Sequence, residues 1–160
     1  MLNAALHIHT APRGSEVDAP VGAGSGRERI VVGYDGSEPA KRALTRAAAL
    51  ADDRTHIVVV AVAEPYPRSG VTIPANLDPA EARRRRHDLD EARALLSERG
   101  LSVETLQVRG DPARALVEAA RDADLAIVGS RSLNRLQRLI LGSVSSKVAR
   151  DAVSDVLVVR

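Results

Sequence analysis

The chain reads Val128-Gly129-Ser130-Arg131-Ser132, continues through nine residues, and then reads Gly142-Ser143-Val144-Ser145. The apolar run 125–128 predicts a buried strand before this stretch, and residues 143–152 predict a helix at its end. The first turn of a helix carries unpaired backbone N–H groups and the positive end of the helix dipole. The glycine at its start would let a ligand approach the backbone, and the first serine would add a hydroxyl near the N-cap. The stretch therefore predicts a loop that holds the phosphates of a nucleotide.

Apolar runs alternate with amphipathic segments along the rest of the chain. Strands are predicted at 29–33, 56–63, 101–108, 125–129 and 155–159, and helices at 38–51, 79–99, from 112 and at 143–152. Ser37 and Asp111 suit N-caps because their side chains can accept hydrogen bonds from the free first-turn amides. The alternation of strand and helix predicts an α/β fold, a single doubly wound domain with a five-stranded parallel sheet and four helices.

The composition fits such a fold and excludes several kinds of site. The chain has 160 residues, no Phe, no Trp and no Cys, so its core is built from aliphatic residues and disulfides and thiol chemistry are excluded. Residues 1–27 end in a Gly-rich run and are predicted to be a flexible tail, with the domain at 28–160. No apolar run reaches membrane-spanning length and no secretory signal is visible, so we expect a cytoplasmic protein without membrane contact.

Two features predicted separately should meet at one edge of the sheet. In an open α/β sheet, ligands bind outside the carboxyl ends of the strands, at the point where the winding direction switches. The first strand delivers Asp35 to that edge, and the fourth strand delivers Gly129. We therefore expect Asp35, Gly129 and Gly142 to face one crevice.

Four motifs together carry a resemblance to the universal stress protein family, over residues 29–160. They are Ile30-Val31-Val32-Gly33-Tyr34-Asp35-Gly36-Ser37, Gly110-Asp111-Pro112-Ala113, Gly129-x2-Ser132-x9-Gly142-Ser143 and Asp155-Val156-Leu157-Val158-Val159. The resemblance implies an adenine-nucleotide-hydrolase-like sheet with strand order 3-2-1-4-5. It also implies a homodimer through the last strand, whose apolar residues would otherwise form an exposed edge.

The resemblance implies an ATP site, with or without Mg²⁺, and a role for each matching residue. Asp35 would accept hydrogen bonds from the ribose hydroxyls or help to hold a metal–phosphate unit. Val62 would offer backbone groups to adenine, and Gly129 and Arg131 would face the ribose and phosphates. Gly33 in the first motif and Ser132 in the third are also expected to bind the nucleotide. The amides and hydroxyls of the last four expected residues would bind phosphate: Gly142, Ser143, Val144 and Ser145.

Ser132 is where the chain departs from the family pattern G-x2-G-x9-G-[S/T]. If the second glycine of that pattern needs a positive φ, a residue with a Cβ costs roughly 1–2 kcal/mol there. If the position needs only a close approach, serine fits and can donate a hydrogen bond. The change bears on nucleotide affinity and leaves the fold untouched.

Several residues also have simpler interpretations. Asp35 could be a turn residue that bonds its own backbone. Arg131 is better placed for a ligand than Arg135 and Arg138, which are spaced like the solvated face of a short helix. The run Arg83–Arg86 would fan around a helix among acidic residues, which favours a solvated helix over nucleic-acid binding. His7 and His9 could pair on a metal but are better explained as part of the tail, and no metal site is predicted.

The function that these features favour is ATP binding in a regulatory, stress-response module that acts on a partner and is not primarily an enzyme. Phosphate-holding groups are present, but the sequence shows no general base or second carboxylate for turnover, although slow hydrolysis or autophosphorylation remains open. The alternative is a dimeric interaction module that binds no nucleotide, with Ser132 marking a lost site. A nucleotide-using transferase is disfavoured because the loop at 34–37 lacks a Ser-Gly-Gly-x-Asp-Ser phosphate cradle.

Overall fold

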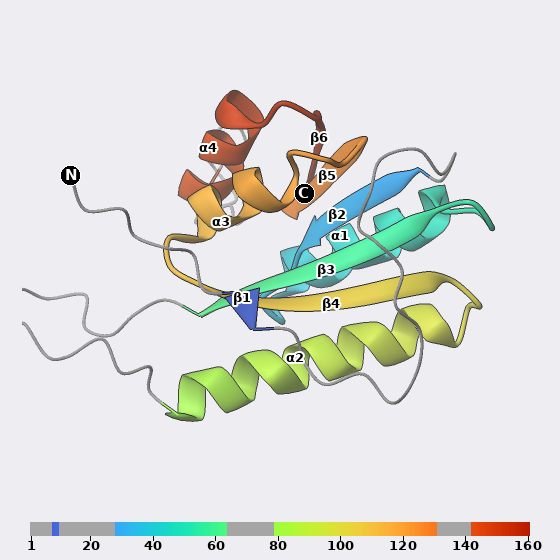
Figure 1. Cartoon of the computed structure of the whole chain (residues 1–160), viewed down its shortest axis with the longest axis horizontal. Coiled ribbons are helices and arrows are strands. Elements are labelled where there is room, and N and C mark those ends of the chain that lie inside the picture. Colours follow the sequence, from blue (N-terminus) through green and yellow to red (C-terminus); the bar gives the residue numbers. More distant parts are fainter. Residues whose placement is uncertain (1–7, 10–27, 64–78, 131–141) are drawn as a thin grey trace, which may run out of the picture.

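The computed structural model describes residues 8–9, 28–63, 79–130 and 142–160 (Figure 1). Its strands are β1 (Ile8–His9), β2 (Arg29–Gly33), β3 (His56–Ala63), β4 (Ser102–Arg109), β5 (Leu125–Gly129) and β6 (Asp155–Val159). Its helices are α1 (Glu38–Leu50), α2 (Pro79–Ser97), α3 (Pro112–Ala119) and α4 (Ser143–Asp151).

The strands form one sheet in the order β1-β4-β3-β2-β5-β6. The five strands from β2 to β6 run parallel, which confirms the predicted order 3-2-1-4-5 when β2 is counted as the first strand. The chain winds outward from β2 to β4 in one direction and from β5 to β6 in the other. The switch point therefore lies between β2 and β5, the two strands whose carboxyl ends carry Asp35 and Gly129.

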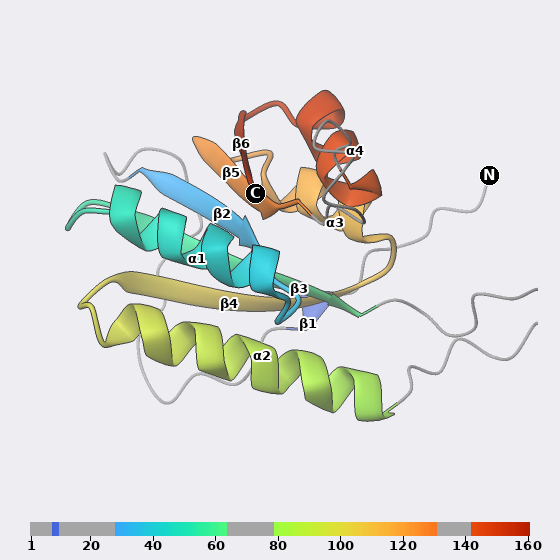
Figure 2. The same cartoon turned by 180° about the vertical axis from the view of Figure 1, so that it is seen from behind.

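Two apolar layers cover the two faces of the sheet, because alternate strand residues point to opposite sides. On one face, α1 and α2 pack against a cluster that includes Ile30, Val32 and Ile127. On the other face, α3 and α4 pack against a cluster that includes Val31 and Val58. Figure 1 shows α3 and α4 in front, and the reverse view in Figure 2 brings α1 to the front.

The helix starts follow the predicted capping residues. The Ser37 hydroxyl accepts from the Ala40 amide at 3.4 Å, and the Asp111 carboxylate accepts from the Arg114 amide at 2.9 Å. Helix α2 ends at Ser97, two residues earlier than predicted, and Gly100 follows with φ of 74°. A left-handed glycine after a helix is a common way of ending it.

Strand β1 was not predicted. It pairs antiparallel with β4 at the edge of the sheet, with Ile8 opposite Val108 and His9 opposite Gln107. The two residues fall inside the segment predicted to be a tail, and the rest of that segment lies outside the described residues. In the described ranges, no helix combines the length and the apolar character needed to cross a membrane.

Candidate functional site

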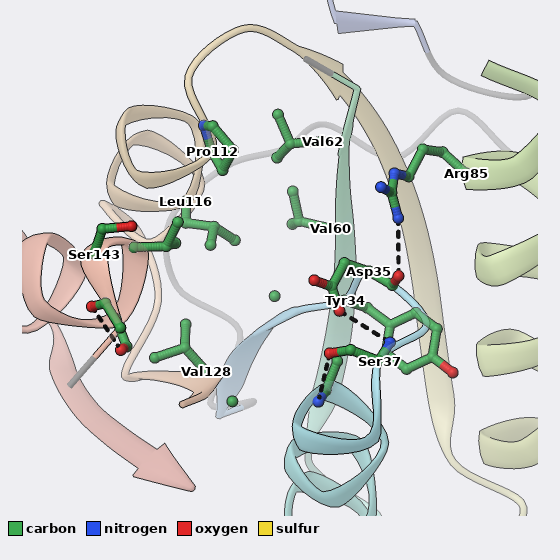
Figure 3. Close-up of a pocket in the computed structure, with 16 residues that line it drawn as sticks. Tyr34, Asp35, Ser37, Val60, Val62, Arg85, Pro112, Leu116, Val128 and Ser143 are labelled. Carbon is green, nitrogen blue, oxygen red and sulfur yellow. Dashed lines mark hydrogen bonds between the residues drawn. The ribbon is translucent and has the colours of Figure 1, made fainter. Parts of the chain in front are cut away.

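A cavity of about 310 Å³ lies at the carboxyl ends of β2, β3 and β5 (Figure 3). The loop after β2 forms one wall, and α3 and the start of α4 form the facing wall. The lining residues are Gly33, Tyr34, Asp35, Ser37, Ala40, Val60, Val62, Arg85, Pro112, Leu116, Val128, Gly129, Gly142, Ser143, Val144 and Ser145. The cavity therefore occupies the switch point of the sheet, where an open α/β fold binds its ligands.

The carboxylate wall of the cavity is a tight turn after β2. The Asp35 Oδ1 atom accepts a hydrogen bond from the Ser37 amide at 3.0 Å, and Gly36 between them has φ of 75°. The bond confirms the turn that an Asp-Gly pair predicts. The same residue lines the cavity, so its structural role and its position at the site coexist.

The facing wall contains the first turn of α4. Gly142 is the N-cap and makes no side-chain capping bond, while the Ser145 hydroxyl donates to the Gly142 carbonyl at 3.0 Å. Ser143 is exposed, and Ser145 is buried. Because first-turn amides have no acceptor within their helix, this end of α4 offers hydrogen-bond donors and a positive partial charge to an anion in the cavity.

Gly129 has a structural reason to be glycine that the sequence did not reveal. A Cβ added there would lie 2.4 Å from the Pro39 carbonyl carbon and 2.8 Å from the Ala40 amide nitrogen. The end of β5 thus touches the backbone at the start of α1. At Gly33, an added Cβ would meet the tip of the Leu116 side chain at 2.9 Å, which can move more easily.

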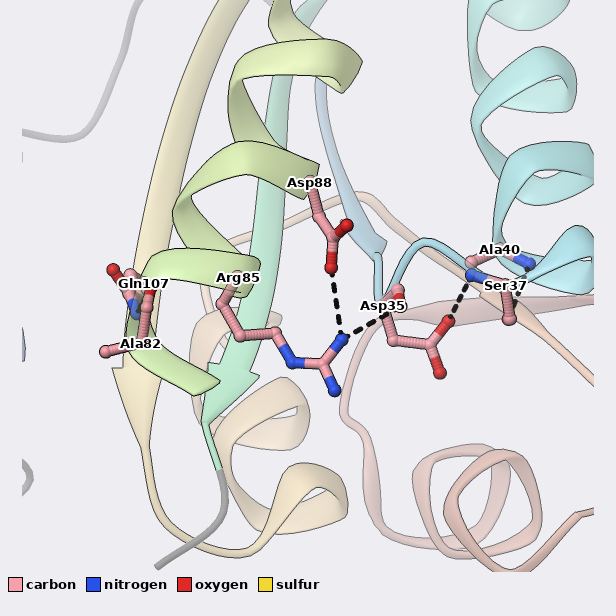
Figure 4. A network of polar contacts seen from close by, with 7 residues as sticks. All are labelled: Asp35, Ser37, Ala40, Ala82, Arg85, Asp88 and Gln107. Carbon is pink, nitrogen blue, oxygen red and sulfur yellow. Dashed lines mark hydrogen bonds and ion pairs between the residues drawn. The ribbon is translucent and has the colours of Figure 1, made fainter. Parts of the chain in front are cut away.

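Arg85 is a charged site residue that sequence reasoning missed. The run Arg83–Arg86 was interpreted as a solvated helix, and Arg83, Arg84 and Arg86 are indeed exposed. Arg85 instead lines the cavity, with 16% of its side chain exposed, and its Nη1 donates to the Asp35 carbonyl at 2.8 Å. Figure 4 shows this contact between α2 and the turn after β2. The prediction was wrong for this one arginine because the contact crosses fifty positions of sequence.

Most of the predicted site residues meet at this cavity. Those that line it are Gly33, Asp35, Val62, Gly129, Gly142, Ser143, Val144 and Ser145. Arg131 and Ser132 lie outside the described residues, as do Arg135 and Arg138. Several other lining residues were not predicted as site residues. Most of them are apolar, such as Val60 and Leu116, and in the sequence they look like any other core residue.

The titratable side chains in the lining are Tyr34, Asp35 and Arg85. The Tyr34 side chain is buried in the layer under α1 and α2, and its hydroxyl has no hydrogen-bond partner among the described residues. Burial, reinforced by the charges of Glu91 and Asp88, raises the pKa of Tyr34 to about 12. The hydroxyl therefore stays protonated at neutral pH, and the cavity combines one carboxylate, one guanidinium and a helix N-terminus. These groups suit the binding of a polar molecule with an anionic end.

Two of the histidines do not line the cavity. His56 sits at the opposite end of the sheet, where its ring contacts the Ser102 hydroxyl at 2.9 Å and the Glu104 carboxylate at 3.3 Å. His87 is exposed on α2. Within the described ranges, no three acidic or histidine side chains are grouped so as to hold a metal ion.

Comparisons with known proteins agree on one family. A sequence model described as the universal stress protein family matches residues 26–160. The stress response protein NhaX of Bacillus subtilis (strain 168) is 30% identical in an alignment that covers 83% of this chain and 98% of NhaX. A crystal structure of a universal stress protein family member from Burkholderia pseudomallei is 31% identical, with a TM-score of 0.66 over 86% of this chain and 98% of that one. A universal stress protein solved in complex with cAMP is 30% identical, with a TM-score of 0.63 over 85% and 99% of the two chains.

Proposed function

This chain belongs to the universal stress protein family, and from that premise we propose that it binds an adenine nucleotide, ATP in particular, in the cavity beside Asp35. In this proposal the protein is a regulatory module of the stress response. Nucleotide binding shifts its conformation or its affinity for a partner, and turnover of the nucleotide is not its main task.

One observation carries the proposal: the Asp35 turn and the first turn of α4 line the same cavity although they are about a hundred residues apart in the sequence. In the proposed complex, Asp35 accepts hydrogen bonds from the ribose hydroxyls and Val62 lies at the adenine. The amides and hydroxyls of 142–145 bind the phosphates, which the positive end of the helix dipole favours. Mg²⁺ would accompany the phosphates as part of the ligand.

Two further facts support this choice of ligand class. The cavity volume of about 310 Å³ is within the range of small-molecule sites in proteins. The relative solved with cAMP, which is 30% identical to this chain, holds an adenine nucleotide. Ser132 lies outside the described residues, and the proposal requires that a serine at this motif position is compatible with ATP binding.

Isothermal titration calorimetry with ATP and Mg²⁺ tests the proposal on the whole chain. Gly142→Asp places a carboxylate at the phosphate end of the cavity, and we expect it to weaken ATP binding at least about tenfold, which is about 1.4 kcal/mol. Ala149→Asp is the matched control, because it adds the same charge at an exposed position of the same helix. Absence of saturable binding by the unmodified chain at millimolar ATP would contradict the proposal, as would equal affinity of the two variants.

We also propose that the chain forms a homodimer through β6. This strand is the edge of the sheet next to β5, and Val156, Leu157, Val158 and Val159 are only partly buried there. Pairing of two such edges would remove both from water and satisfy their backbone groups. Sedimentation equilibrium should give a dimer for the unmodified chain and a weakened dimer for Leu157→Lys. A monomer at all concentrations up to hundreds of micromolar would refute this assembly.

A further inference from the structure

Arg85 connects α2 to the turn that carries Asp35. Its Nη1 atom donates to the Asp35 backbone carbonyl at 2.8 Å and to the Asp88 Oδ2 atom at 3.2 Å (Figure 4). A hydrogen bond from a charged donor is stronger than one between neutral groups. Because the guanidinium is largely buried, solvent weakens this interaction little.

Asp88 holds the same turn from a second direction. The residue is 8% exposed, and a Cβ added to Gly36 would lie 2.8 Å from its Oδ1 atom. The absence of a side chain at Gly36 thus lets the Asp88 carboxylate pack directly on the turn. Arg85 thus contacts the carbonyl of Asp35, and Asp88 occupies the space where a side chain on the next residue would lie.

This contact holds the backbone from which the Asp35 side chain projects. The Asp35 carbonyl points to Arg85, while its carboxylate lies on the cavity side and accepts the Ser37 amide at 3.0 Å (Figure 3). Without the bond to Arg85 the turn could shift as a unit, and the Asp35 α-carbon and its carboxylate would shift with it. The guanidinium therefore holds in place the stretch of backbone that carries the carboxylate.

We propose that Arg85 is a positioning residue of the ligand site: it holds the Asp35 turn so that the carboxylate can accept hydrogen bonds from the sugar hydroxyls of the nucleotide. The inference rests on the proposed function for its ligand. It adds α2 to the site, which the family motifs in the sequence do not include.

The position of Arg85 disfavours a direct role on the phosphates. Figure 3 shows Arg85 beside Asp35 and Val62, with Ser143 across the cavity. The proposed phosphate end lies at Ser143, whereas the guanidinium lies at the sugar and base end. The two hydrogens of Nη1 are donated to Asp88 and to the Asp35 carbonyl, so that atom has none left for a phosphate.

The first experiment needs no nucleotide. Amide exchange followed by NMR should show the Ser37 amide exchanging at least about tenfold faster in Arg85→Gln than in the unmodified chain, because the turn that protects it is released. Arg86→Gln is the matched control, since Arg86 is the exposed neighbour on the same helix. Should Arg85→Gln fail to fold, Arg85→Lys takes its place and should give a smaller acceleration. Unchanged exchange at Ser37 in a folded Arg85 variant overturns the inference.

The second experiment compares the affinities of ATP, 2′-deoxy-ATP and 3′-deoxy-ATP. The Asp35→Asn variant shows how much of the preference for ATP over each deoxy compound depends on the carboxylate. Arg85→Gln should lose the same preference. Its affinity for ATP should fall about tenfold, while its affinities for the deoxy compounds stay almost unchanged. Arg86→Gln should keep the preference, and Arg85→Lys should keep part of it. If the unmodified chain binds ATP and Arg85→Gln keeps its sugar preference, or loses instead the preference for ATP over AMP, the positioning role is overturned. If the unmodified chain binds none of these nucleotides, the proposed function fails, and with it the role of Arg85 at the sugar.

Discussion

The contact between Gly129 and the start of α1 gives a sharp test of how the cavity is built. Gly129→Ala adds a Cβ 2.4 Å from the Pro39 carbonyl carbon and 2.5 Å from its oxygen. An ordinary contact begins at 3.4 Å, so the two backbones must separate by about 1 Å. Overpacking of this kind costs about 1–3 kcal/mol, and backbone atoms cannot rotate away as a side chain can. We therefore expect the upper end, about 3 kcal/mol.

Gly100→Ala is the comparison variant. Gly100 has φ of 74° and no atom within 4 Å of an added Cβ, so the substitution there carries a conformational cost without a contact. That cost is about 1–2 kcal/mol. Gly129 is not among the glycines with a positive φ, so its expected cost comes from the contact, and the comparison sets that cost against a purely conformational one.

Urea unfolding followed by far-ultraviolet circular dichroism measures both variants, because the chain has no Trp for fluorescence. In a thermal melt followed by the same signal, a loss of about 3 kcal/mol should lower the Tm of a chain of this length by about 6–12 °C. Gly129→Ala within about 0.5 kcal/mol of the unmodified chain, or less destabilised than Gly100→Ala, would refute the reasoning. Such a result would mean that α1 moves away from β5 at little cost.

Two further predictions concern pH and capping. The raised pKa of Tyr34, about 12 against 10.0 in the unfolded chain, favours the folded state below pH 10, and this stabilisation is lost as pH rises toward 12. The loss should be about 2 kcal/mol at pH 11.5 in urea unfolding and should be absent in Tyr34→Phe; equal pH dependence of the two proteins would contradict it. Asp111→Ala removes the acceptor for the Arg114 amide and should cost about 1 kcal/mol in the same assay, with little added by the exposed ion pair to Lys147. A loss below about 0.3 kcal/mol would show that this cap contributes nothing.

The sequence predicted the parallel sheet well because its strands are continuous apolar runs between turn residues. The bounds predicted for four strands, 29–33, 56–63, 125–129 and 155–159, are those observed. The helix starts followed from Ser37 and Asp111, whose side chains act locally on the amides three positions ahead. These features depend on neighbours in sequence, so a single chain is enough to reveal them.

The parts that were missed depend on contacts between distant segments. Strand β1 has two residues and no periodicity of its own, so only β4 defines it. Arg85 has the same neighbours in sequence as the exposed arginines beside it, and only the packing of α2 on β3 and β4 brings it to Asp35. For Gly129, the family resemblance implied a position facing the ribose and phosphates, whereas the structure adds the approach of α1.

The way the cavity is assembled has a consequence for the folding of the chain. Its lining comes from 33–40, 60–62, residue 85, 112–116, 128–129 and 142–145, which together span most of the domain. No fragment from either half of the chain contains both the carboxylate and the helix end. A ligand that contacts both would hold the first and last parts of the fold together. Because the unfolded chain has no such site, dissociation of the ligand and separation of those parts would be thermodynamically coupled.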